Sequence, residues 1–121
     1  MSQPIRVIIA NDQQSVATMW QRLIDRQNDM ESPACAYNGF QAVELAAAHK
    51  PHVVVMDVMM PGMDGIEATR KIVEQGNNTK IIICSARPDI EDEARSAGAV
   101  EVLGLPLLPD ILLGAIRKAV G

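Results

Sequence analysis

The chain has 121 residues, of which 48% are hydrophobic, and 11 basic against 15 acidic side chains give it a net charge of −4. This length suits one globular domain, and we expect residues 1–121 to form it. The sequence contains no apolar run of the ~18 residues that a membrane span needs, no secretory signal pattern and no basic patch, so we expect a cytoplasmic domain that binds neither membranes nor nucleic acids itself.

Five short apolar runs predict the strands of a sheet. Four of them are rich in branched aliphatic residues, as is typical of strands buried on both faces: residues 5–10, 53–56, 80–84 and 100–103. The fifth run, residues 34–37, contains fewer strand formers, but it occupies the place where an edge strand would complete the alternation.

Segments with a helical period separate these strands. The clearest amphipathic face consists of Val16, Met19, Trp20, Leu23 and Ile24, which recur at i, i+3, i+4, i+7 and i+8. Four further faces follow along the chain: Phe40, Val43 and Ala47; Ile66, Thr69, Ile72 and Val73; Ile90, Ala94 and Ala97; Ile111, Leu112, Ala115, Ile116 and Ala119. Gly114 in the last helix costs about 1 kcal/mol relative to Ala, which indicates either a close packing contact or a softened helix.

A strand followed by a helix, repeated five times with short connections, predicts a doubly wound α/β fold with a parallel sheet covered on both faces. Ligands of such sheets bind outside the carboxyl ends of the strands. Asn11 and Asp12 follow the first strand, Asp57 the third, and Ser85 the fourth. Because carboxylates brought together repel each other unless a hard cation lies between them, this pattern indicates a magnesium site.

Asn11, Asp12 and Asp57 are also residue types that cap helices and turns, and this structural interpretation stays open. Asp57 directly follows the apolar run 53–56, which leaves its carboxylate at a strand end instead of in a solvated loop. That position favours a functional site over a cap.

Residues 57–65 read Asp-Val-Met-Met-Pro-Gly-Met-Asp-Gly. They resemble the phosphoacceptor loop of the receiver domains of response regulators in two-component signalling, which reads Asp, two residues, Met-Pro, two residues, Asp-Gly. The likeness extends over the chain, through residues 5–12, 38–39, 85–86 and 97–99. It implies a flavodoxin-like fold with five helices and a five-stranded parallel sheet in the order 2-1-3-4-5.

The resemblance also implies roles for the site residues. Asp57 would take a phosphoryl group from a sensor histidine kinase, a phosphotransfer protein or a small donor. Mg2+ would be held by Asp12, Asp57 and the backbone carbonyl of Met59, and by Asn11 through a water. Ser85 would bond a phosphoryl oxygen and move the face made by the fourth helix, fifth strand and fifth helix, which is also an expected homodimer surface. Such a domain signals and is not an enzyme, beyond slow self-phosphorylation and self-dephosphorylation.

Three positions depart from the family pattern. Asn11 stands where a second acidic residue is usual, which weakens the expected magnesium affinity. Leu105 replaces a lysine, a loss of about 1.5–3 kcal/mol if no other group bonds the phosphoryl, and Arg87 is the only nearby basic candidate. Val102 replaces an aromatic switch residue, so coupling to the surface would be muted. Neither Met59 nor Arg87 can orient an attacking water, so self-hydrolysis would be slow.

Other classes of protein remain in competition. The main alternative is a pseudo-receiver, which keeps the fold as a protein-interaction module and works without phosphorylation. An aspartate-nucleophile hydrolase would need a carboxylate where the chain has Met59, and a flavodoxin-like cofactor binder would need a hydroxyl- and glycine-rich loop at residues 11–15. Cys35 and Cys84 lack CxxC spacing and are interpreted as inert small hydrophobic residues.

Overall fold

Five parallel strands form one sheet in the order β2-β1-β3-β4-β5. The computed structural model describes residues 3–121. Its strands are β1 (Ile5–Ala10), β2 (Met30–Ala36), β3 (Val53–Asp57), β4 (Lys80–Ser85) and β5 (Glu101–Gly104). Its α-helices are α1 (Gln14–Asp25), α2 (Gly39–His49), α3 (Gly65–Glu74), α4 (Glu91–Ala97) and α5 (Pro109–Val120), and a 3-10 turn, Pro88–Ile90, leads into α4. The predicted fold class and strand order are therefore confirmed.

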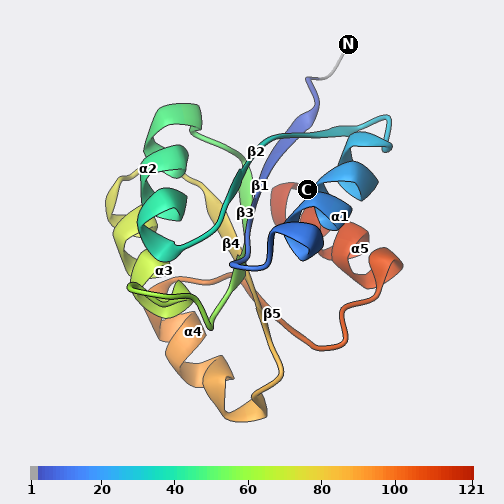
Figure 1. Cartoon of the computed structure of the whole chain (residues 1–121). Helices are drawn as coiled ribbons and strands as arrows, with labels where there is room; N and C mark the ends of the chain where they lie inside the picture. The colour runs from blue at the N-terminus through green and yellow to red at the C-terminus, as the bar shows by residue number, and fades with distance from the viewer. Residues whose placement is uncertain (1–2) are drawn as a thin grey trace.

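The helices cover the sheet in two layers, with α1 and α5 on one face and α2, α3 and α4 on the other (Figure 1). Alternate residues of each strand enter the two cores, because successive side chains of a strand point to opposite faces. Ile8, Val54 and Ile83 pack under α2, α3 and α4, whereas Ile9 and Val55 pack under α1 and α5. Within residues 3–121, no helix is long and apolar enough to cross a membrane.

Strand β2 is longer than predicted, because it begins at Met30 and not at residue 34. Met30 and Ser32 are buried, whereas Glu31 and Pro33 face solvent. This alternation is typical of an edge strand with one covered face, and it hides the strand from a search for continuous apolar runs.

The predicted inward face of α2 was wrong by one residue. Phe40 is 60% exposed, while Gly39, Ala42 and Ala46 are buried. The reason is close packing, since a Cβ atom built on Gly39 would lie 2.3 Å from the carbonyl oxygen of Met63. Only small residues fit where α2 meets the loop after β3, so the larger apolar side chain is turned outward.

Three other large residues of the predicted apolar faces are exposed. They are Met19 on α1, Val73 on α3 and Ile111 on α5. The opposite error occurs at Leu113, which is buried on α5 and was not included in its predicted face. The predicted faces of α3 and α4 are mostly buried, and those of α1 and α5 are buried or half-buried at all but one residue each. Only the face of α2 is shifted, and all five helices lie in the segments predicted for them.

Gly114 lies in the middle of α5, and a Cβ atom built on it meets nothing within 4 Å beyond the backbone of its own helix. The close packing contact considered for this glycine is therefore absent. What remains is the cost of a flexible residue in a helix interior, so Gly114 softens α5 without a packing role.

We predict that Gly114→Ala raises the free energy of unfolding by about 0.5–1 kcal/mol, because it removes backbone entropy without a steric conflict. Gly98→Ala is the matched control. Gly98 ends α4 at φ 114°, and a Cβ atom there would lie 2.8 Å from Val73 Cγ2, so this change should destabilise. Urea unfolding of both variants tests the pair, and a destabilised Gly114→Ala protein would contradict the interpretation.

Candidate functional site

Asp57 is the last residue of β3, and the strand register brings the other candidate residues to the same edge of the sheet. Met56 pairs with Ala10 of β1, so Asn11 lies level with Asp57 and Asp12 follows it. On the other side, Asp57 pairs with Cys84 of β4, which makes Ser85 the next residue beyond it. The carboxyl ends of three adjacent strands therefore meet at Asp57, at the point where the strand order reverses.

The loop after β3 fixes the backbone of Asp57. Asp64 caps α3, since its Oδ1 accepts from the N–H of Glu67 at 2.9 Å. The N–H of Gly65 donates to the carbonyl oxygen of Val58 at 2.9 Å. A Cβ atom on Gly65 would lie 2.2 Å from the carbonyl oxygen of Asp57, so only glycine lets α3 begin this close to the strand end.

The carboxyl group of Asp57 is half-buried, and its surroundings disfavour a negative charge. Burial raises the pKa of Asp57 above its ordinary value, and the nearby carboxylate of Asp12 raises it further. Backbone amide groups of Met59 and Val58 act in the opposite direction and lower the pKa. A divalent cation between the two carboxylates would relieve both the burial and the repulsion.

The oxygen donors fit a magnesium ion better than a transition metal. Within residues 3–121 there is no cluster of three or more His, Cys, Asp or Glu side chains arranged to hold a metal. Magnesium does not need such a cluster, because it keeps several waters and binds through one or two carboxylates. Asn11 Oδ1 accepts from the N–H of Gln13 at 2.9 Å, which leaves its second lone pair for a water.

Ser85 is buried at the end of β4, and its Oγ accepts from the N–H of Arg87 at 3.0 Å. Because the oxygen is engaged as an acceptor, the hydroxyl proton is available to a group above the strand ends. The side chain of Arg87 is exposed and forms an ion pair with Asp89 at 3.0 Å. Arg87 is thus a solvated loop residue that forms no hydrogen bond or ion pair with Asp57.

A cavity of about 230 Å3 adjoins Asp57. Leu105, 47% exposed, forms part of its wall, as expected for a residue at the position of the family's lysine. Sequence reasoning did not assign the other lining residues to a site, among them Gln13, Trp20, Cys84 and Leu107. Two features of the sequence could have pointed to this cavity. Trp20 lies on the predicted inner face of the first helix, and Cys84 directly precedes Ser85. Cys35 and Cys84 are both free thiols, and burial raises the pKa of Cys84 to about 12.

The fold and the site define a doubly wound domain with an acidic pocket at its topological switch point. The response regulator receiver domain family matches residues 7–117, and the chain belongs to this family. It is 41% identical to the uncharacterized transcriptional regulatory protein YxjL of Bacillus subtilis, over 95% of this chain and 54% of that protein. It is 32% identical to the chemotaxis protein CheY of Listeria monocytogenes, over 95% of this chain and 98% of that protein.

Solved structures agree with this assignment. The response regulator domain of Thermotoga maritima CheB superimposes with a TM-score of 0.91 at 32% identity, covering 98% of this chain and 97% of that one. The chain is thus a receiver domain of response regulators, a signalling domain of a family characterised by magnesium-dependent phosphorylation. It spans about half of YxjL and nearly all of CheY.

The raised pKa of Asp57 predicts a pH-dependent stability in the absence of divalent cations. The folded state holds this proton more tightly than the unfolded state, so stability falls as pH rises from about 3.8 through the folded pKa and stays lower above it. Asp57→Asn should therefore melt a few degrees higher than wild type at pH 7 in EDTA, and this advantage should vanish near pH 3.

Thermal unfolding monitored by circular dichroism checks this, with Glu44→Gln as a control for the loss of one exposed negative charge. A constant difference between Asp57→Asn and wild type from pH 3 to pH 7 would show that the carboxylate of Asp57 is not destabilising.

Proposed function

We propose that residues 1–121 act as one phosphoacceptor domain, in which Asp57 receives a phosphoryl group in a magnesium-dependent reaction. The observation that supports this most directly is the place of Asp57, half-buried at the end of β3 and close enough to Asp12 for that carboxylate to raise its pKa. A residue that only caps a helix or a turn does not require burial beside a second carboxylate. The cap of the following helix is a different residue, Asp64.

The chemistry follows from these groups. The carboxylates of Asp12 and Asp57 and the carbonyl of Met59 would hold Mg2+, with Asn11 orienting one of its waters. When bound, the ion neutralises charge on the phosphoryl oxygens. A carboxylate oxygen of Asp57 attacks phosphorus in line, and the bond to the donor breaks with its electrons leaving on the donor. The hydroxyl of Ser85 donates to a phosphoryl oxygen.

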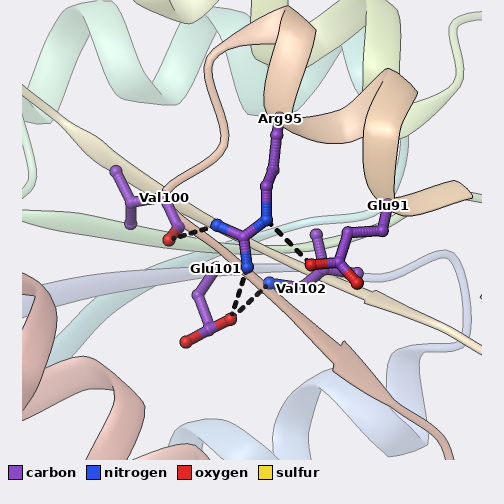
Figure 2. Close-up of polar contacts among 5 residues, drawn as sticks. All are labelled: Glu91, Arg95, Val100, Glu101 and Val102. Carbon is purple, nitrogen blue, oxygen red and sulfur yellow. Dashed lines mark hydrogen bonds and ion pairs between the residues drawn. The ribbon is translucent and has the colours of Figure 1, made fainter.

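The route from Ser85 to the surface would pass through α4 and β5. Figure 2 shows Arg95 of α4 between Glu91 and the start of β5. Its guanidinium donates to Glu91 Oε2 at 2.9 Å, to Glu101 Oε1 at 3.0 Å and to the carbonyl oxygen of Val100 at 3.1 Å. Exposed ion pairs are individually weak, but one planar group shared by three acceptors ties α4 to β5. We propose that these elements move as one face.

We propose that the same face, completed by α5, forms the homodimer. Val100 and Ile111 are large apolar side chains that are exposed there, which is a feature of protein interfaces. Val102 is only partly buried and packs against the core. It is too short to change between a buried and an exposed rotamer as a large aromatic side chain does. The contacts of Arg95 with Glu91, Val100 and Glu101 would then couple Ser85 to this face, a role that an aromatic residue usually has in the family.

A second surface suits the phosphoryl donor. A groove of about 840 Å3 runs beside α1 and shares Trp20 and Leu107 with the cavity at Asp57. Met19 and Leu23 line it together with two basic side chains, Arg22 and Arg26. We propose that a sensor histidine kinase or phosphotransfer protein docks here, in the cytoplasm, because a donor bound in this groove lies next to the acceptor.

One observation favours the alternative of a pseudo-receiver that works without phosphorylation. Leu105 lies at the wall of the cavity, and among the described residues no Lys or Arg lines that cavity. A transferred phosphoryl group would thus meet no charged donor from the protein. The two candidate functions differ in one measurable event, the formation of phospho-Asp57.

Incubation with acetyl phosphate and magnesium, followed by intact-mass measurement, separates them. We expect wild type to gain the mass of one phosphoryl group, because attack requires only an ionised carboxylate, a cation and in-line geometry. Asp57→Ala and wild type in EDTA are the controls and should stay unmodified. If wild type stays unmodified at saturating donor and metal, the pseudo-receiver is the correct function.

We further predict that Leu105→Lys raises the yield or lifetime of the adduct, since it restores a charge-assisted bond of about 1.5–3 kcal/mol to the phosphoryl group. Leu108→Lys is the matched control. It adds the same charge three residues away, at an exposed side chain that does not line the cavity. Equal adduct yields for wild type and both variants would mean that another group already replaces the lysine.

A further inference from the structure

The cavity at Asp57 carries negative charge that no side chain of the described chain balances. Asp57 lines it, and Asp12 is close enough to Asp57 to influence its carboxyl group. The nearest basic candidate, Arg87, is held in the exposed ion pair with Asp89. A carboxylate in a half-buried pocket attracts a counter-ion more strongly than one in open water, because the local dielectric constant is lower.

The walls of the cavity determine which cation suits it. Most of them are apolar, and they include the aliphatic side chains of Leu105 and Leu107 and the indole of Trp20. An aromatic face attracts an organic cation, and aliphatic walls favour an alkyl chain over a hydrated ion. Gln13 and Asn11 also line the cavity, and their amide oxygens could accept hydrogen bonds from an ammonium group.

We infer that this cavity is a binding site for a short primary alkylammonium ion, with the ammonium group against the Asp57 carboxylate and the alkyl chain along Leu105, Leu107 and Trp20. Mg2+ competes with the ammonium group for the Asp57 carboxylate but gains nothing from the apolar walls, because it binds oxygen donors and its own waters. An anion is repelled by the carboxylates, and a neutral alcohol of the same length lacks the charge. The site therefore selects for both a positive charge and an apolar stem.

The inference goes beyond the proposed function and does not require phosphorylation. It is tested on the full chain in EDTA, without any phosphodonor, through the fluorescence of Trp20, which is the only tryptophan in the sequence and is 8% exposed. Titration with n-propylammonium chloride should give a saturable change in emission. Sodium chloride at equal ionic strength and 1-propanol at equal concentration should not.

Two variants locate the binding. Asp57→Asn should weaken n-propylammonium binding by at least about tenfold, since it removes the charge and keeps the shape. Leu105→Lys should abolish the response, because its own ammonium group would occupy the cavity. Glu44→Gln and Leu108→Lys, which change charge elsewhere by the same amounts, should bind as wild type does. Circular dichroism at the titration temperature verifies that each variant is folded.

Equal responses of wild type and Asp57→Asn, or equal responses to n-propylammonium and 1-propanol, would overturn the inference, as would the absence of any saturable change. None of these results bears on the proposed function, which is decided by the mass of the acetyl phosphate reaction product. Conversely, a failure of phosphorylation leaves the cation titration unaffected.

Discussion

The close approach of α3 to the end of β3 is the constraint on which the site depends. Gly65 has no side chain, and this lets α3 begin against the carbonyl of Asp57, while Asp64 caps the helix in the same turn. Asp57 also pairs with Cys84 of β4 and directly follows Met56, which pairs with Ala10 of β1, so its backbone has little freedom. The carboxylate therefore stays half-buried although burial disfavours its charge. Moving it into solvent would require breaking the strand pairing and the packing of α3 that hold its backbone.

Side chains bond backbone groups of both outer strands of the sheet at single positions. At β2, Asp25 Oδ1 accepts from the N–H of Ser32 at 2.7 Å, and Gln21 Nε2 donates to the carbonyl oxygen of the same residue at 2.9 Å. At β5, Glu101 Oε1 accepts from the N–H of Val102 at 3.0 Å, and Arg95 donates to Val100. Backbone groups that are bonded in this way are not free to pair with a strand of another chain, which makes edge pairing less favourable at these positions.

The sequence predicts the central strands well and the contacts of the helices less well. Strands β1, β3 and β4 are buried on both faces, so their apolar runs mark them within one residue. The bounds of strand β2 and the inward face of α2 depend on which side of each element other parts of the chain cover. The composition of a segment alone does not reveal that. The positions of the carboxylates and Ser85 were predictable because each lies at, or within two residues of, the end of a strand. The cavity was not, because its walls combine α1 with the loop before α5, and only the folded chain brings these together.

The two departures at the site are better understood together than separately. Relative to the family pattern, Asn11 removes one negative charge and Leu105 removes one positive charge, so the net charge around Asp57 is the same as in a site with three acids and a lysine. The attraction for a divalent cation depends largely on that net charge, whereas the hold on a phosphoryl oxygen depends on a directed donor. We therefore expect metal binding to be retained better than the stability of the phosphorylated state. Because Asn11 still accepts from Gln13 as an aspartate would, the exchange of acid for amide leaves the start of α1 intact and alters only the charge.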